Sequence, residues 1–204
     1  MRIIRDDIDR FFEYGVDISS RTIYMGSTNR DDDDAETGTD HEMAEYVIKG
    51  LHMLDVQAEN GNKPITILMN NPGGDEYHGL AIFDAIRGCK NYVYIKVFGH
   101  AMSMGSIILQ AADERLMAPN SRMMLHYGTW SGSGDHAKNT YKWAEEGQKF
   151  DKWMEDLYLE KIKEKHPRFT RKKLQDRINF DYIITAKEAV DLGLADEVLG
   201  DDFI

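Results

Sequence analysis

The fold is decided by Tyr92-Val-Tyr-Ile-Lys-Val-Phe98, which leads through Gly99-His-Ala-Met-Ser-Met104 into Gly105-Ser-Ile-Ile-Leu-Gln-Ala-Ala112. The first segment is rich in β-branched and aromatic residues and predicts a strand. The glycine and the small residues after it predict a turn, and the apolar run that follows predicts a helix. The stretch therefore predicts a strand that passes directly into a helix.

The preceding stretch has the same organisation. Pro64-Ile-Thr-Ile-Leu-Met69 predicts a buried strand, Asn70-Asn-Pro-Gly-Gly74 breaks it, and Gly79-Leu-Ala-Ile-Phe-Asp-Ala-Ile86 predicts a helix. Strands that alternate with helices imply βαβ units, a largely parallel sheet and right-handed crossovers. In such sheets reactive groups collect at the strand-to-helix turns, because backbone N–H groups and helix dipoles meet there.

A further unit lies nearer the N-terminus. Arg21-Thr-Ile-Tyr-Met25 predicts a strand, and Thr39 with Glu42 has the spacing of a capping box at the start of a helix. Between them, Asp31-Asp-Asp-Asp34 repels itself and favours a solvated loop, and its spacing lacks the alternating ligands and glycine of an EF-hand. We interpret residues 28–38 as an acidic insertion and expect no metal site.

The composition is typical of a globular protein and argues against several other classes of protein. A chain of 204 residues can bury roughly 70% of its unfolded surface, so we expect one domain over residues 1–204. The hydrophobic fraction of 42% and the charged fraction of 30% are ordinary for a globular protein. The formal charge of -11 argues against nucleic acid as a partner. Short apolar stretches argue against a membrane span.

The expected compartment is the cytoplasm. The N-terminal Met1-Arg-Ile-Ile-Arg-Asp-Asp7 lacks the apolar core of a signal peptide. The single cysteine, Cys89, cannot form an internal disulfide, which fits a reducing compartment. We interpret this cysteine as a small buried hydrophobe rather than a catalytic thiol.

The C-terminal part begins with the glycine-rich Gly128-Thr-Trp-Ser-Gly-Ser-Gly134, which we expect to be exposed. A long helix follows over about residues 138–165 and ends before Pro167. Its aromatic residues fit either packing on the core or contact with another subunit, and both remain open. Thr185 and Glu188 predict a final helix with a capping box.

Four residues or turns suit acyl transfer, although each has a simpler explanation. Ser103 is a candidate nucleophile or a helix N-cap. The Gly73-Gly74 pair is a candidate oxyanion hole or a tight turn. His126 is a candidate base or a hydrogen-bonded core residue, and Asp181 either orients that base or is a turn residue. Together, in this order at strand ends, they supply every part that acyl transfer needs.

These motifs resemble the Clp protease proteolytic subunit (ClpP) family, and the resemblance covers residues 21–199. The matching stretches are Asn71-Pro-Gly-Gly74, Gly79-Leu-Ala-Ile-Phe-Asp84, Ala101-Met-Ser-Met-Gly105, Ala118-Pro-Asn-Ser-Arg-Met-Met-Leu-His126, and Asp181-Tyr-Ile-Ile-Thr-Ala-Lys-Glu-Ala189 with Gly193-Leu-Ala-Asp196. The resemblance implies an α/β crotonase-like fold of repeated βαβ units, with residues 128–165 as a protruding handle.

The same resemblance implies that Ser103 is the nucleophile, His126 the base and Asp181 the acid, with the N–H groups of Gly74 and Met104 as the oxyanion hole. It implies a serine endopeptidase that cleaves unfolded proteins and peptides without a cofactor. It further implies a homo-oligomer of stacked heptameric rings and an AAA+ unfoldase as partner. The alternatives are a non-catalytic ring or adaptor subunit with this fold, and an acyl-CoA-processing crotonase relative.

The sequence departs from the family pattern at several places. Asp75-Glu-Tyr-His78 replaces smaller or apolar residues after the glycine pair, so we expect a preference for basic or polar substrates. His100 replaces a glutamine, and we expect a structural role for it. Tyr127-Gly128 replaces Gln-Pro before the handle. The N-terminus and the acidic insertion differ where a partner ATPase or the ring pore would be affected.

Overall fold

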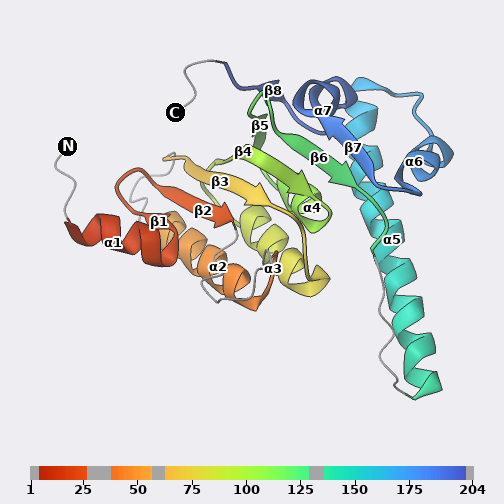
Figure 1. Ribbon diagram of the computed structural model, residues 1–204, viewed down its shortest axis with the longest axis horizontal. Coiled ribbons are helices and arrows are strands. Elements are labelled where there is room, and N and C mark those ends of the chain that lie inside the picture. Colours follow the sequence, from red (N-terminus) through yellow and green to blue (C-terminus); the bar gives the residue numbers. More distant parts are fainter. Residues whose placement is uncertain (1–4, 27–37, 57–62, 129–135, 201–204) are drawn as a thin grey trace.

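The computed structural model describes residues 5–26, 38–56, 63–128 and 136–200. Within these ranges the strands form one sheet in the order β1-β2-β3-β4-β5-β8, with β6 paired to β4 and β7 paired to β6 (Figure 1). The strands are β1 (Val16–Asp17), β2 (Thr22–Gly26), β3 (Ile65–Asn71), β4 (Val93–Met102), β5 (Glu114–Met117), β6 (Arg122–Leu125), β7 (Tyr182–Thr185) and β8 (Glu197–Val198). The helices are α1 (Arg5–Tyr14), α2 (His41–Val56), α3 (Glu76–Arg87), α4 (Met104–Leu109), α5 (Ala137–Lys165), α6 (Arg171–Ile178) and α7 (Ala186–Leu192).

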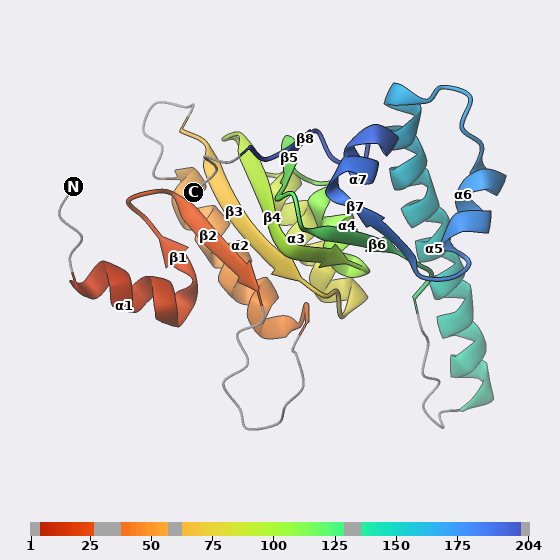
Figure 2. The ribbon, with the colours of Figure 1, turned by 45° about the horizontal axis from the view of Figure 1, so that its top comes forward.

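The centre of the sheet is parallel, as the alternation of strands and helices predicts. β2, β3, β4 and β5 pair in parallel, whereas β1 pairs with β2 and β6 with β7 in antiparallel fashion. Along β3, the side chains of Ile65, Ile67 and Met69 are fully buried and alternate with partly exposed ones. Helices α2 and α3 lie side by side against the sheet (Figure 2). The mixed α/β class expected from the sequence is confirmed.

Strand β4 extends further than expected, and its extension positions the site. The sequence predicts a strand that ends at Phe98, but β4 continues to Met102 because it changes partner. It pairs with β5 up to Val97 and with β6 from His100 onwards. The change occurs at Gly99, whose φ is 73° and where a Cβ would lie 2.4 Å from Asn70 Oδ1. The turn is therefore confined to the last residues before α4.

One predicted helix cap is wrong and another is confirmed. Thr39 does not cap α2, because its hydroxyl bonds to the side chain of Asn71 (3.0 Å to Nδ2). Its N–H donates to the carbonyl of Gly73 (2.5 Å), and its carbonyl accepts from the N–H of Asp75 (2.7 Å). The side chain of Asp40 accepts from the N–H of Met43 instead (2.9 Å). At α7 the capping box of Thr185 is present as predicted.

Helix α5 is partly buried and partly exposed. In the half nearer its C-terminus, Met154, Tyr158 and Ile162 are buried in the core. In the other half, most side chains are exposed, Trp143 among them, and this half extends away from the body (Figure 1). Core packing therefore accounts for the aromatic and apolar residues of the C-terminal half of α5.

Several short elements were not predicted from the sequence, and two predicted loops lie at least partly outside the described residues. No element is predicted from the sequence over α1, β1, β5, α6 or β8, which are short or amphipathic. The acidic run Asp31-Asp-Asp-Asp34 and most of the glycine-rich segment fall outside the described residues. None of the helices in the described ranges combines enough length with enough apolar character to cross a bilayer.

Candidate active site

Ser103 stands between β4 and α4 in a conformation that serine rarely adopts. Its φ is 50° and its ψ is −122°. A side chain at positive φ is strained, and such strain concentrates at functional turns. The Ser103 N–H donates to the carbonyl of Met124 (2.9 Å), which ties the turn to β6. The Ser103 side chain makes no capping bond to α4, so the N-cap interpretation does not explain it.

Glycines allow this turn to pack tightly. A Cβ on Gly73 would lie 2.5 Å from Cβ of Ser103, and the φ of Gly73 is 103°. A Cβ on Gly105 would lie 2.8 Å from the carbonyl oxygen of Asn71. The side chain of Asn71, fully buried, accepts from the N–H of Gly73 (2.7 Å). The glycine turn after β3 is thus held directly against the serine turn after β4.

Strand register brings His126 and Asp181 together although 55 residues separate them. In the antiparallel pair of β6 and β7, Leu125 is opposite Tyr182. The next position along this register places His126 opposite Asp181. Because β6 also runs parallel to β4, with Met124 paired to Met102, Ser103 and His126 both lie within two residues of this last pair. The sheet therefore brings three chain segments to one point.

The three predicted side chains are in hydrogen-bond contact. Ser103 Oγ lies 2.8 Å from His126 Nε2, and His126 Nδ1 lies 3.1 Å from Asp181 Oδ1. An ionised carboxylate only accepts, so Nδ1 carries the proton, and Nε2 then accepts from the serine hydroxyl. The His126 side chain is 21% exposed and that of Asp181 66% exposed. The arrangement suits proton transfer from a hydroxyl that attacks a carbonyl carbon.

Gly74 and Met104 both line the cleft beside Ser103. Gly74 forms a bridge with Thr39, but the two bonds of that bridge use the carbonyl of Gly73 and the N–H of Asp75. The N–H of Gly74 is therefore not used by the bridge. Met104 is the first residue of α4, where an N–H has no acceptor within the helix. Gly74, Met104 and Ser103 all line the same hollow.

The cleft has a volume of about 420 Å³ and two walls. One wall is formed by Ser103, His126 and the start of α3. The other comes from α5, where Trp143, Phe150 and Met154 contribute apolar surface. Trp143 also meets the ring of Tyr77 edge-on across the cleft, with centroids 6.3 Å apart. The helical period of these α5 residues predicts a helix but does not indicate that they line the cleft beside Ser103.

The start of α3 makes the cleft acidic. The carboxylate of Asp75 caps α3 by accepting from the N–H of His78 (2.9 Å). Glu76 lines the cleft with Glu146 of α5. Burial, followed by the negative charges of Asp151, Asp75 and Glu146, raises the pKa of Glu76 above its ordinary value. Each charge that raises the pKa of Glu76 is negative, and although Glu146 pairs with Lys149 (2.7 Å), the cleft beside Glu76 is acidic.

Cys89 and His100 lie outside the hydrogen-bonded group of Ser103, His126 and Asp181. Burial, then the charges of Asp55 and Asp113, raises the pKa of Cys89 to about 11, so its thiol stays protonated. His100 lies within β4 opposite Arg122, and its backbone N–H donates to Asn70 Oδ1 (3.3 Å). Among the described residues, no group of three or more His, Cys, Asp or Glu side chains is arranged to hold a metal ion.

Comparison with known proteins gives one consistent result. A family model described as Clp protease matches residues 34–202. An ATP-dependent Clp protease proteolytic subunit of Deinococcus radiodurans is 35% identical over 165 residues, which are 80% of this chain and 77% of that protein. The matched region includes both turns, the long helix and all three hydrogen-bonded side chains.

Proposed function

Since the chain belongs to the Clp protease family, we propose that Ser103, His126 and Asp181 are the catalytic triad through which it cleaves peptide bonds. The family makes the protein a serine peptidase of the Clp type. The observation that supports these three residues most strongly is the 2.8 Å contact of Ser103 Oγ with His126 Nε2, made from a strained serine backbone.

In the proposed mechanism His126 Nε2 takes the hydroxyl proton as Ser103 Oγ attacks the carbonyl carbon of the substrate. Asp181 keeps the Nδ1 proton in place and stabilises the imidazolium that forms. The imidazolium then gives its proton to the leaving amine, and the acyl group stays on Ser103. A water molecule, activated by the same histidine, releases the acyl group as a carboxylic acid.

The N–H groups of Gly74 and Met104 are proposed to stabilise the oxyanion of both tetrahedral intermediates. Each such donor contributes about 3 kcal/mol to transition-state stabilisation. Support comes from the hydrogen bonds of the Gly73–Asp75 turn, which leave the Gly74 N–H out of the bridge to Thr39. Support for the Met104 N–H comes from its place at the start of α4, where it has no acceptor within the helix.

The acidic wall supports a preference for substrates with a basic side chain near the scissile bond. Glu76 and Glu146 border the hollow beside Ser103, and Lys149, which pairs with Glu146 (2.7 Å), is exposed. A lysine or arginine of the substrate would place its charge against the wall and its alkyl chain against Trp143. This proposal follows the expectation drawn from Asp75 and Glu76 in the sequence.

The proposed assembly follows that of the Clp protease family. We propose a single domain over residues 1–204 that forms a cytoplasmic homo-oligomer of stacked heptameric rings, fed by an AAA+ unfoldase. The exposed half of α5 supports a role of residues 128–165 as the handle between rings, because it extends from the body with Tyr141 and Trp143 exposed. An apolar surface of this kind needs a partner to cover it.

Peptide hydrolysis and light scattering on the wild type and Ser103→Ala test this function together. We expect both proteins to form the same large oligomer, and only the wild type to hydrolyse an unstructured peptide. A monomer whose hydrolysis is unchanged in Ser103→Ala would contradict both the triad and the assembly. An oligomer that hydrolyses no peptide would favour the non-catalytic subunit.

A further inference from the structure

Two buried hydroxyl groups connect the serine turn to the long helix α5. Ser106 Oγ lies 2.7 Å from the carbonyl oxygen of Ser103 and 2.7 Å from the hydroxyl oxygen of Tyr158. Ser106 is 0% exposed and Tyr158 is 1% exposed, so water does not compete for these contacts. Tyr158 belongs to α5, 52 residues after Ser106 in the chain.

The direction of both hydrogen bonds follows from counting protons. The carbonyl of Ser103 only accepts, so the single hydroxyl proton of Ser106 goes to that carbonyl. Ser106 Oγ then has no proton left for Tyr158, and Tyr158 must donate. The Tyr158 hydroxyl therefore donates to Ser106 Oγ, and the Ser106 hydroxyl donates to the carbonyl of Ser103. Consecutive hydrogen bonds with one direction strengthen each other in a buried setting.

These two hydrogen bonds act on the backbone of Ser103, the proposed nucleophile. The carbonyl of Ser103 accepts from the N–H of Ser106 (3.0 Å) and from its hydroxyl. Fixing that carbonyl fixes the peptide plane that follows Ser103, and this plane includes the N–H of Met104. The ψ of Ser103 and the direction of a proposed oxyanion donor thus depend on the same two hydroxyl groups. At a strained φ of 50°, the turn needs such contacts to stay in place.

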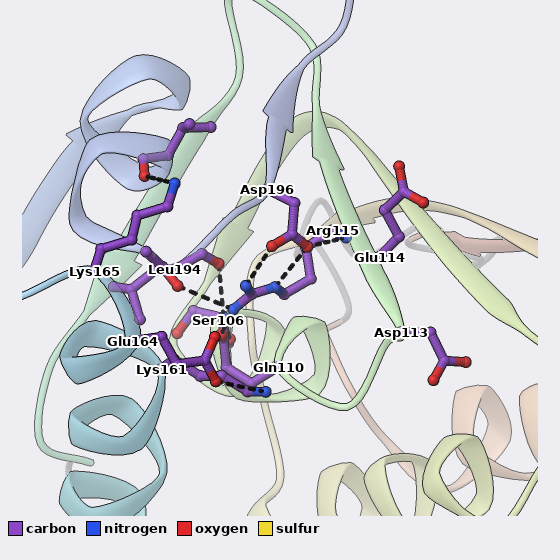
Figure 3. Close-up of polar contacts among 12 residues, drawn as sticks. Ser106, Gln110, Asp113, Glu114, Arg115, Lys161, Glu164, Lys165, Leu194 and Asp196 are labelled. Atoms are coloured by element: carbon purple, nitrogen blue, oxygen red, sulfur yellow. Dashed lines mark hydrogen bonds and ion pairs between the residues drawn. The ribbon is translucent and has the colours of Figure 1, made fainter.

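The other end of α4 is held by a separate polar network (Figure 3). Gln110 donates to the carbonyl oxygens of Ser106 (3.2 Å) and Leu194 (3.1 Å), and accepts from Arg115 Nη1 (2.7 Å). Arg115 in turn contacts both carboxylate oxygens of Asp196. Because this network anchors α4 without the Tyr158 hydroxyl, loss of that hydroxyl leaves the helix attached and removes only the contact that orients the Ser106 hydroxyl toward the carbonyl of Ser103.

We propose that Tyr158 and Ser106 are positioning residues, which hold the carbonyl of Ser103 and so align the nucleophile and the Met104 N–H for acylation. The proposal rests on the proposed function of Ser103 and goes beyond it, because neither residue touches substrate. The pair acts on the rate of the chemical step and leaves substrate binding to the cleft unchanged.

The test measures acylation, binding and stability in the same variants of the assembled full-length protein. Tyr158→Phe removes one oxygen and keeps the buried ring, and Ser106→Ala removes the second hydroxyl. The matched control is Ser121→Ala, since Ser121 is also buried and its hydroxyl also donates to a carbonyl three residues earlier, that of Ala118 (2.7 Å). The readouts are the labelling rate with a fluorophosphonate, kcat and KM for a peptide, and the thermal midpoint.

We expect Tyr158→Phe and Ser106→Ala to lower both kcat and the maximal labelling rate about five- to tenfold, with KM little changed. The double variant should match Ser106→Ala alone, because Tyr158 acts only through Ser106. Ser121→Ala should lower the thermal midpoint by a similar amount and leave kcat at the wild-type value.

Three results would overturn the proposal, and each has a different meaning. If both variants label Ser103 at the wild-type rate while they lose stability like Ser121→Ala, the hydroxyl chain is structural only and the proposed function stands. If the wild type itself is not labelled, the proposed function fails and this inference fails with it. Additive losses in the double variant would also contradict it, because they would separate Tyr158 from Ser106.

Discussion

His126 Nε2 lies 2.8 Å from Ser103 Oγ, although the two residues follow different strands. The contact exists because β4 changes its partner at Gly99 and runs on beside β6, so both strands end at the same point. The antiparallel register of β6 with β7 adds Asp181 on the far side of the imidazole. Three strand ends thus build the proposed triad.

Asp181→Asn is expected to lower kcat/KM at least about a hundredfold, with the fold intact. The amide can donate to Nδ1, which favours the tautomer whose Nε2 carries the proton and cannot accept from Ser103. Steady-state hydrolysis of a peptide measures the effect, and circular dichroism monitors the fold. Asp191→Asn is the control, since Asp191 is exposed on α7. Equal activity of Asp181→Asn and wild type would remove Asp181 from the triad.

Gly73→Ala is expected to abolish activity because a Cβ there would lie 2.5 Å from Cβ of Ser103. The positive φ of 103° adds a backbone cost of about 1–3 kcal/mol. The serine turn must therefore move or the protein must unfold in part. Urea unfolding and fluorophosphonate labelling separate these two effects. Gly200→Ala, where nothing lies within 4 Å, should behave like the wild type. Wild-type labelling in Gly73→Ala would show that the two turns are not packed as described.

Part of this site was predictable from the sequence because its candidate groups follow strand-like segments in one order, although each group alone also fits a simpler role. Glycines at 73 and 74, a serine between a strand and a helix, and a histidine at the end of a strand each leave a pattern in the chain, whereas the register of β6 with β7 does not. The capping box at Thr185 is a local pattern of the same kind, and it is present. Local rules hold where no distant residue competes for the same groups.

The remainder depends on contacts between distant segments. Thr39 has the spacing of a cap, but it bonds to the turn at Gly73 and Asp75, a preference that no local rule reveals. The α5 wall of the cleft and the Tyr158–Ser106 contact are set by tertiary packing across more than fifty residues. A helical period shows which side of α5 is apolar, but it cannot show which element that side meets.

Glu76→Gln is expected to reduce the preference for a basic over an apolar peptide about two- to fivefold, the range of a partly solvated ion pair. In the wild type the preference should fall with decreasing pH, because the raised pKa of Glu76 makes its carboxylate take up a proton at a higher pH than an ordinary glutamate. The groups around it are Asp75, Glu146 with its partner Lys149, Asp151 and His126. The ratio of kcat/KM values for two matched peptides, measured against pH, gives the result.

A second variant separates the acidic wall from the helix cap. Asp75→Ser with Glu76→Val removes both charges, and serine retains the N-cap function that Asp75 has at α3. Glu45→Gln on α2 is the control, since Glu45 is exposed and pairs with Lys49. A cleavage profile on a peptide library that is the same in the wild type and the double variant would contradict the proposed substrate preference.

Asp196→Asn is expected to destabilise the protein by about 2–3 kcal/mol at neutral pH, because it takes the charged partner from the nearly buried Arg115. Burial alone would raise the pKa of Asp196, but the hydrogen bonds from Arg115 outweigh it and the pKa lies below its ordinary value of 3.8. The stabilisation is therefore present above that value and is lost as the pH falls through the lower, folded-state pKa.

Urea unfolding at several pH values measures this linkage. The wild type should lose its advantage over Asp196→Asn as the pH falls below about 4. Asp176→Asn, which removes an exposed ion pair with Lys172, should change stability by less than about 0.5 kcal/mol. A constant difference between wild type and Asp196→Asn down to the acid limit would contradict the assigned ion pair.

Mass-spectrometric mapping of a fluorophosphonate adduct on the assembled wild-type protein tests the central claim most directly. A serine reacts readily with this reagent only when a base activates it and an oxyanion site accepts the developing charge. We predict a single adduct on Ser103, which disappears in Ser103→Ala and is strongly reduced in His126→Ala. An assembled, folded protein that carries no adduct on Ser103 would contradict the proposed triad.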